Sequence, residues 1–285
     1  MPIPDLYAVF GHPIGHSKSP YIHALFAKQT DQFMSYSSEE VLPEDFEQRV
    51  RKFFQAGGQG LNCTVPLKEL AFSLADQKSQ RAELSKAVNT LALRADGTID
   101  GDNTDGIGLM RDLCHNWQIP LQARRILLLG AGGASRGIIA PILEQCQDRL
   151  VVANRTPEKA MRLAMEFGDL GPISGCGFKE LTGQTFDLVI NATAASLSGE
   201  VPELPEKLLT LGACCYDLAY GNRPTAFVEW GEKNGAALSV DGIGMLVEQA
   251  AESFAIWRGI RPETRPVIEA LNAERRSQGL KLRVG

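Results

Sequence analysis

The spacing of apolar residues divides the chain into two halves with different patterns. In the second half the apolar runs are continuous and end in glycine or polar residues, at residues 125–130, 149–154, 186–193, 213–220 and 236–242. Helical patterns separate most of these runs. Continuous apolar strands that alternate with helices are typical of a parallel sheet covered by helices on both faces, and we expect one here.

The first half has shorter strand-like runs between helical patterns. We expect helices at residues 19–30 and 43–57, where Ser19 can cap the first and Gly57 can close the second. Turn-forming residues crowd the stretch 95–106. Strands are expected at residues 6–11, 33–41, 60–65 and 87–94.

A strongly amphipathic stretch at residues 244–259 predicts a long helix late in the chain. This helix should pack outside the second sheet or back on the first half. With 285 residues, the chain is long enough for one large domain or two ordinary ones. The whole pattern therefore predicts an α/β protein.

Composition and charge narrow the class of function. The net charge is −5 and both signs are mixed along the chain, which argues against partners such as nucleic acid or a membrane surface. No apolar run reaches the roughly 18 residues of a membrane span, and no signal peptide is recognised. Six cysteines without a Cys-x-x-Cys pair indicate reduced, buried thiols in a cytoplasmic protein. Four histidines, three of them within residues 12–23, predict no metal site.

The stretch ILLLGAGGASRG places a glycine-rich turn between a buried strand and a helix. Gly130, Gly132 and Gly133 follow the strand directly. Glycines there allow a tight turn and close approach of the backbone, and the helix N-terminus offers N–H groups to a pyrophosphate. The position of the turn therefore predicts a dinucleotide site, the alternative being a plain strand-to-helix turn. Ser135, at the third small position, departs from the usual Gly or Ala.

The residues after the next strand indicate which nucleotide binds. An NAD site usually has Asp or Glu there, roughly 20 residues after the glycines, to bind the ribose 2′-hydroxyl. A carboxylate would repel a 2′-phosphate, whereas a guanidinium donates several hydrogen bonds to it. We therefore predict NADP over NAD. The alternative of solvated charges is weakened because cations at a helix start oppose the helix dipole. The residues concerned, in the stretch ANRTPEK, are Asn154, Arg155, Thr156 and Lys159.

Polar residues also follow the strands of the first half, at the sheet edge where open α/β sheets bind ligands. Ser17 and Ser19 precede a helix, and hydroxyls with free N–H groups can bind a carboxylate there. Lys68, Asn89 and Asp105 lie near the ends of predicted strands. Each has a structural alternative: Ser19 and Asp105 as helix caps, Asn89 as a strand-end hydrogen bonder, and Lys68 as a surface lysine.

Nine blocks of sequence, in this order and spacing, resemble the shikimate dehydrogenase family over essentially the whole chain. The blocks are AVFGHPIGHSKSPYIH, GLNCTVPLK, KAVNTL, GDNTDGIG, LLGAGGASRG, ANRTPEK, FDLVINAT, YDLAYG and DGIGMLVEQAA. The family reduces 3-dehydroshikimate to shikimate with NADPH, in chorismate and aromatic amino-acid biosynthesis. The resemblance implies an N-terminal α/β/α substrate domain, residues 1–104 and 243–285, and a Rossmann-type doubly wound NADP-binding domain, residues 105–242.

The resemblance also implies which residues surround each ligand. The small-molecule substrate would be held by Ser17, Ser19, Thr64, Lys68, Asn89, Asp105, Tyr220 and Gln249. NADP would be held by Gly130, Ala131, Gly132, Gly133, Ala134, Asn154, Arg155, Thr156, Lys159, Leu218 and Gly242. Family members occur as monomers and homodimers, and the sequence does not distinguish these states.

Lys68 and Asp105 are the candidate catalytic residues. Ketone reduction needs a hydride on carbon and a proton on the developing alkoxide, and an ammonium within hydrogen-bond reach can supply the proton and stabilise the charge. Asp105 would hold Lys68 in position, favour its charged form and bind a substrate hydroxyl. In the reverse direction, a neutral Lys68 would act as the base.

Four features depart from the family pattern. Cys63 stands where Val is common, Ala24 where Asn is common, and Gln80 where an acidic residue often lies. The stretch NATAASLSGE lacks the usual continuation after Thr193. Two alternative functions remain at this stage: a quinate/shikimate dehydrogenase of relaxed cofactor use, and a non-catalytic NADP-binding sensor.

Overall fold

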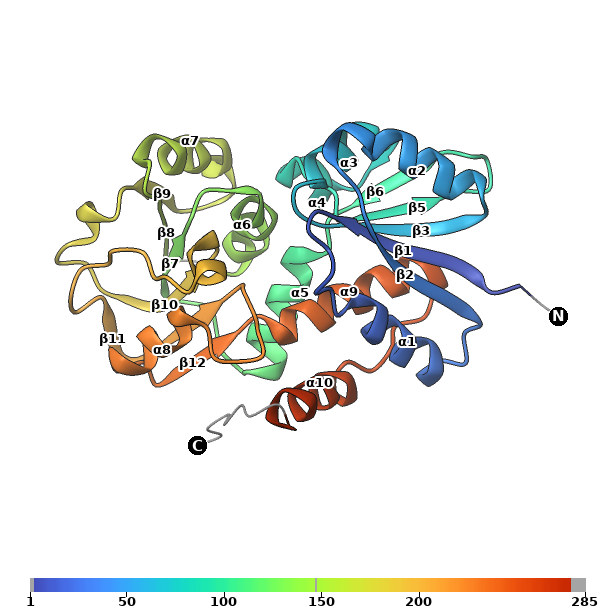
Figure 1. The fold of residues 1–285 in the computed structure, drawn as a ribbon. Coiled ribbons are helices and arrows are strands. Elements are labelled where there is room, and N and C mark those ends of the chain that lie inside the picture. Colours follow the sequence, from blue (N-terminus) through green and yellow to red (C-terminus); the bar gives the residue numbers. More distant parts are fainter. Residues whose placement is uncertain (1–2, 147, 278–285) are drawn as a thin grey trace. The chain divides into compact units, whose positions relative to one another are not determined.

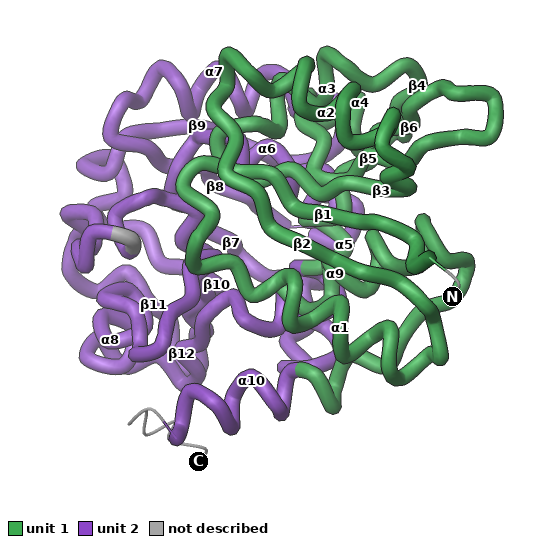
Figure 2. The backbone as a smooth tube through the Cα atoms, turned by 45° about the vertical axis from the view of Figure 1, so that its right-hand side comes forward, with its two compact units in different colours: residues 1–108, 246–267 green, residues 109–245, 268–285 purple. Residues whose placement is uncertain are grey.

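The computed structural model describes residues 3–146 and 148–277. Contacts within the chain group it into two compact units, which Figure 2 shows in different colours. Unit 1 comprises Met1–Gly108 and Leu246–Val267, and unit 2 comprises Leu109–Met245 and Ile268–Gly285. Each unit therefore combines two separate segments of the chain.

Unit 1 contains a six-stranded mixed sheet with the strand order β2-β1-β3-β5-β6-β4. Strand β1 runs parallel to both of its neighbours, whereas β5 runs antiparallel to β3 and β6. The strands are β1 (Asp5–Gly11), β2 (Met34–Glu40), β3 (Gly58–Cys63), β4 (Gln77–Lys78), β5 (Thr90–Leu93) and β6 (Ile99–Asp102).

Helices cover both faces of this sheet. Successive side chains along a strand point to opposite faces, so each face has apolar side chains that a helix layer can bury. Phe10 and Leu61 point into a core formed with α2, α3 and α4. On the other face, the Tyr7 ring packs against the Trp257 ring of α9, with centroids 4.9 Å apart, and α1 also contacts β1 and β2 (Figure 1). The helices are α1 (Ser19–Gln29), α2 (Phe46–Gln55), α3 (Lys68–Leu74), α4 (Gln80–Ser85) and α9 (Ile243–Arg258), with a 3₁₀ turn η1 (Pro43–Asp45).

From Leu246 onward, α9 packs on the first half of the chain, which decides between the two placements expected from its pattern. The Trp257 Nε1 donates to the Leu91 carbonyl (3.0 Å). Gly60 makes this contact possible, since a Cβ on Gly60 would overlap the Trp257 ring. Arg258 adds an ion pair with Asp5 at 2.5 Å.

Unit 2 contains a six-stranded sheet in which every pairing is parallel, in the order β12-β11-β10-β7-β8-β9. The four residues 126–129 of β7 are all fully buried, as expected for a strand covered on both faces. The strands are β7 (Arg125–Leu129), β8 (Arg149–Ala153), β9 (Ile173–Cys176), β10 (Phe186–Asn191), β11 (Leu209–Asp217) and β12 (Leu238–Asp241).

The helices of unit 2 pack on different parts of this sheet. Helix α7 packs on β8 and β9 and against α6, whereas α8 packs on β11 and β12. The chain passes between the units within α5, α9 and α10. The remaining helical elements are α5 (Asp105–Arg111), the π-helical turn η2 (Asp112–Asn116), α6 (Gly133–Gln145), α7 (Pro157–Phe167), η3 (Gly168–Leu170), η4 (Lys179–Leu181), η5 (Ala194–Ser198), α8 (Ala226–Lys233) and α10 (Arg265–Ser277).

The predicted α/β class and the parallel second sheet are confirmed. The stretch 95–106 is not only turn: β6 forms a hairpin with β5 around Gly97, whose φ is +86°. Strand β9 was not predicted, because its four residues carry a single large apolar side chain. The domain bounds expected from the family resemblance stay a prediction. No helix in the described part of the chain is long and apolar enough to cross a membrane.

Candidate active site

Lys68 and Asp105 form an ion pair in unit 1. Strand β3 ends at Cys63, and a turn closed by the hydrogen bond from the Leu67 amide to the Thr64 carbonyl (2.8 Å) leads into α3, which begins at Lys68. The Lys68 Nζ lies 2.5 Å from Asp105 Oδ2. Their side chains are 21% and 10% exposed, so water screens the pair less than it screens a surface ion pair.

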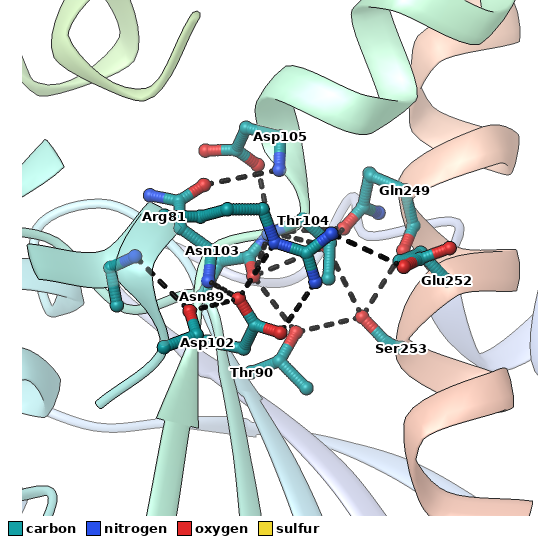
Figure 3. Close-up of polar contacts among 12 residues, drawn as sticks. Arg81, Asn89, Thr90, Asp102, Asn103, Thr104, Asp105, Gln249, Glu252 and Ser253 are labelled. Atoms are coloured by element: carbon teal, nitrogen blue, oxygen red, sulfur yellow. Dashed lines mark hydrogen bonds and ion pairs between the residues drawn. The ribbon is translucent and has the colours of Figure 1, made fainter. Parts of the chain in front are cut away.

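Asn89 fixes the orientation of the Asp105 carboxylate. Its Nδ2 donates to Asp105 Oδ1 (2.8 Å), and its Oδ1 accepts from the Thr104 amide (3.0 Å). The backbone amide of Asn89 donates to the backbone carbonyl of Asp102 (3.0 Å), so the pairing of these neighbouring strands fixes where the Asn89 side chain lies. Figure 3 shows how the Asn89, Thr104 and Asp105 side chains lie together. One carboxylate oxygen is thus held by an amide while the other meets the ammonium.

Helix α9 presents two polar residues to the same cluster (Figure 3). The Gln249 Oε1 accepts from Asn89 Nδ2 (3.2 Å), and the Ser253 Oγ lies 2.7 Å from the hydroxyl of Thr90. The Asn62 Nδ2 also donates to Ser253 Oγ (3.1 Å). Residues four apart lie on one face of a helix, which explains why Gln249 and Ser253 both reach the strand ends.

Ser17 and Ser19 lie at the start of α1. The prediction that Ser19 caps this helix was wrong: Lys18 is the N-cap residue, and its side chain makes no capping bond. The Ser17 Oγ accepts from the Ser19 amide instead (3.3 Å), and the Ser19 side chain lies beside the Tyr36 hydroxyl. The Tyr36 hydroxyl donates to Asn62 Oδ1 (2.6 Å). Ser19 therefore lies next to Tyr36, whose hydroxyl is joined through Asn62 to the cluster around Asn89.

An aromatic layer lies behind Tyr36. The His23 ring stacks on the Tyr36 ring, with centroids 4.1 Å apart and planes 6° apart, and the Phe254 ring lies 6.1 Å from it. Neither His23 nitrogen has a hydrogen-bond partner among the described residues. Burial lowers the pKa of His23 to about 3, so this imidazole is neutral at ordinary pH and packs as an apolar ring.

Cys63 also belongs to a core and not to the polar cluster. It is 2% exposed and packs with Phe10 and Leu61. Burial raises the pKa of its thiol well above the usual range. Cysteine in place of the valine common in the family is therefore a small apolar substitute.

The glycine turn of unit 2 leaves space for a ligand. Gly130 has a φ of +103°, which favours glycine. A Cβ added to Gly132 or Gly133 would meet no atom within 4 Å, so the turn is open at the N-terminus of α6. Ser135 is fully buried and donates to the Gly130 carbonyl (2.8 Å), which explains how a serine replaces the usual third small residue. Ala131 is half-buried and Ala134 is exposed.

The end of β8 leads into a group of exposed polar residues at the start of α7. Asn154 follows β8, and its Nδ2 donates to the Thr156 carbonyl (3.0 Å), which shapes the turn. Arg155, Thr156 and Lys159 are exposed. No carboxylate among the described residues forms an ion pair with Arg155 or Lys159. These cations are therefore free to meet an anionic ligand.

The segment after β11 contains Leu218 and Tyr220. The Leu218 amide donates to the Asn191 carbonyl (2.9 Å). Gly242 donates to the Ala219 carbonyl (3.2 Å), and a Cβ on Gly242 would overlap the Leu218 carbonyl, so this position requires glycine. Burial, with a contribution from Asp241, raises the pKa of Tyr220.

The structure brings Lys68, Asn89, Asp105 and Gln249 into one bonded cluster within unit 1. Tyr220 and the predicted cofactor residues lie in unit 2. Ser253 and Tyr36 were not predicted. The four-residue spacing from Gln249 was a usable signal for Ser253, whereas Tyr36 had none. The described residues include no group of three or more His, Cys, Asp or Glu placed to bind a metal.

The chain matches three family models: the shikimate dehydrogenase substrate binding domain over residues 9–91, shikimate/quinate 5-dehydrogenase over 113–198, and the shikimate 5′-dehydrogenase C-terminal domain over 242–271. A shikimate dehydrogenase (NADP(+)) from Methylococcus capsulatus is 64% identical over 274 residues, 96% of this chain and 98% of that protein. One from Alkalilimnicola ehrlichii is 55% identical over 95% of this chain and 99% of its own length.

A solved structure has the same fold. The crystal structure of shikimate 5-dehydrogenase from Thermus thermophilus, in complex with NADP(H) and shikimate, has a TM-score of 0.83 and 32% identity. The match covers 94% of this chain and 99% of that one. The 64% identity to the Methylococcus capsulatus protein, over 96% of this chain, shows that the chain belongs to the shikimate dehydrogenase family.

Proposed function

We propose that the protein is an NADP-dependent shikimate dehydrogenase. It reversibly reduces 3-dehydroshikimate to shikimate, a step of chorismate and aromatic amino-acid biosynthesis. The observation that carries the proposal is the Lys68–Asp105 pair at 2.5 Å, oriented by Asn89, in a chain of this family. A proton donor held beside a carboxylate is the arrangement that carbonyl reduction needs.

The residues of unit 2 fit the nucleotide. The open glycine turn accommodates a pyrophosphate at the helix N-terminus, and Arg155 with Lys159 offers cations for a 2′-phosphate. Asn154 and Thr156 shape that turn, while Leu218 and Gly242 form a close backbone contact beside β12. When bound, NADPH supplies the hydride.

Residues of unit 1 carry out the proton transfer. The Lys68 ammonium donates a proton to the substrate oxygen as negative charge develops there, and its charge stabilises that oxygen. Asp105 keeps the ammonium in place and accepts a hydrogen bond from a substrate hydroxyl. In the reverse reaction the neutral Lys68 amine takes the proton back.

The other predicted substrate contacts stay proposals of the same kind. Ser17 and Ser19 offer hydroxyls at the start of α1 for the substrate carboxylate, and Thr64, Asn89 and Gln249 offer groups for its hydroxyls. Tyr220, in unit 2, is a further proposed contact. The remaining predictions are a cytoplasmic location, which the six free cysteines support, and a monomeric or homodimeric state.

One assay tests the function. Purified protein is supplied with NADP or NAD and with shikimate or quinate, and the appearance of reduced nucleotide is followed by absorbance. We expect turnover with NADP and shikimate and much less with NAD or quinate. Comparable rates with quinate and NAD would favour the relaxed relative. Nucleotide binding without turnover would identify a sensor and contradict the proposal.

A further inference from the structure

A buried carboxylate without a charged partner lies at the end of β11. Asp217 is fully buried, and no cation among the described residues forms an ion pair with it. Four neutral groups donate to it instead. They are Asn191 Nδ2 (3.0 Å) and the Ala219 amide (3.1 Å) on Oδ1, and the hydroxyls of Ser196 and Thr225 (both 2.6 Å) on Oδ2. Such a group is costly to bury, and its bonds fix a geometry more than they add stability.

The bonds of Asp217 join segments that are separate in sequence. Asn191 ends β10, Ser196 lies in the 3₁₀ turn η5, and Thr225 is the N-cap residue of α8, where its hydroxyl accepts from the Val228 amide (3.2 Å). One carboxylate thus sets the positions of the loops that follow two neighbouring strands. These loops lie at the carboxyl ends of parallel strands, where such sheets bind ligands.

The loop at residues 192–199 lies directly against the glycine turn. A Cβ on Gly130 would come within 3.0 Å of the Ala192 carbonyl oxygen and 3.3 Å of the Thr193 methyl group. The Ala192 amide donates to the Leu129 carbonyl (2.8 Å), which holds the start of the loop. Any displacement of this loop therefore changes the surroundings of the turn.

Ser196 is the link from η5 to Asp217. The other hydroxyls of this loop bond locally: Thr193 to Asn191 Oδ1 (2.7 Å) and Ser198 to the Ala195 carbonyl (2.9 Å). Only Ser196, among the described hydroxyls of η5, bonds to a residue of β11. The stretch NATAASLSGE departs from the family pattern, but its Ser196 bonds to Asp217 at the end of the neighbouring strand β11.

The strand order indicates which half of a dinucleotide this loop would touch. Strand β7, which carries the glycine turn, lies between β8 on one side and β10 on the other. In the proposed function the 2′-phosphate end is bound after β8, by Arg155. The opposite half of the nucleotide must then extend toward the ends of β10 and β11.

We propose that Asp217, acting through Ser196, is a positioning residue for the nicotinamide half of NADP. The carboxylate holds the loop at residues 192–199 against the glycine turn, so that the loop is already in place when the nucleotide binds. The 2′-phosphate half of the nucleotide, at Arg155, binds independently of the bond between Ser196 and Asp217. The inference rests on the proposed function and adds a role for a loop that the family pattern leaves unexplained.

The test compares two ligands on the full-length protein without substrate. Dissociation constants for NADPH and for adenosine 2′,5′-bisphosphate, which carries only the 2′-phosphate half, are measured by calorimetry. Ser196→Ala should weaken NADPH about tenfold, or about 1.4 kcal/mol, and leave the bisphosphate unchanged. Ser198→Ala removes a hydroxyl from the same loop without touching Asp217 and should change neither constant.

The outcomes separate this inference from the proposed function. If Ser196→Ala binds NADPH as tightly as the wild type, the link does not position the nucleotide. If both ligands weaken equally, the variant has damaged the unit as a whole, and the inference is also overturned. Failure of the wild type to bind NADPH would instead contradict the proposed function. Asp217→Asn, should it fold, is expected to show the same selective loss of NADPH affinity.

Discussion

Replacing Lys68 tests the proposed chemistry most directly. Its Nζ lies 2.5 Å from Asp105 Oδ2, and its side chain is 21% exposed, so Lys68→Ala removes a defined donor from a mostly shielded position. Loss of a general acid lowers the rate by about 10²–10⁴-fold, which corresponds to about 3–5 kcal/mol of activation free energy. We expect kcat to fall by at least about 10²-fold, while the KM for 3-dehydroshikimate changes far less.

The same variant has a smaller effect on folding. Asp105 keeps its hydrogen bond from Asn89 (2.8 Å), so the carboxylate is not left without a partner. Breaking a fully buried ion pair costs about 3–5 kcal/mol, and this partly exposed pair should lose less in free energy of unfolding. Chemical denaturation at the assay temperature checks that the loss of turnover is not a loss of folded protein.

Two further variants sharpen the result. Lys68→Arg keeps a positive charge and hydrogen-bond donors, but a guanidinium does not release its proton at ordinary pH. It should therefore retain stability without restoring kcat. Lys78→Ala removes another partly buried lysine, which bonds to the Ala75 carbonyl (2.6 Å), and should turn over normally. Turnover of Lys68→Ala within about tenfold of the wild type, below the range for acid–base catalysis, or full activity of Lys68→Arg, would refute the reasoning.

Three other expectations follow from the site. Arg155→Ala should raise the KM for NADPH much more than for NADH, because only NADPH has the 2′-phosphate. Arg162→Ala, which removes an exposed arginine of α7, is the control, and equal effects of Arg155→Ala on both nucleotides would contradict the assignment. Ser17→Ala with Ser19→Ala should raise the KM for shikimate, and an unchanged KM would place the carboxylate elsewhere. The pKa of His23 is about 6.5 in the unfolded chain and about 3 in the folded protein, so the unfolded chain takes up a proton first and acidification favours unfolding. Between pH 7 and 5 the free energy of unfolding of the wild type should therefore fall by about 2 kcal/mol through this residue. Urea denaturation should show that His23→Phe lacks this loss.

The local pattern of the chain predicted most of its elements. Strand β7 reads as five residues of mostly apolar sequence, and α6 follows a glycine turn whose residues have the backbone freedom that it needs. Such signals lie within a few residues of one another, so propensity and periodicity reveal them. The short strand β9 lacked the signal, because ISGC contains one large apolar residue and is held in place by pairing with β8. Ser19 was misassigned as a cap because sequence cannot show which of two serines meets the helix amides.

The sequence by itself determined the residue types of the candidate site: a lysine after one strand, an asparagine before another, an aspartate at a helix start, and cations in place of an acid after β8. Only the tertiary structure decided which of them meet. Lys68 and Asp105 are 37 residues apart, and Asn89 and Gln249 are 160 apart. These contacts exist because β3, β5 and β6 pair side by side and α9 returns to cover the same sheet. Strand order and long-range packing are properties of the whole chain, so no local stretch encodes them.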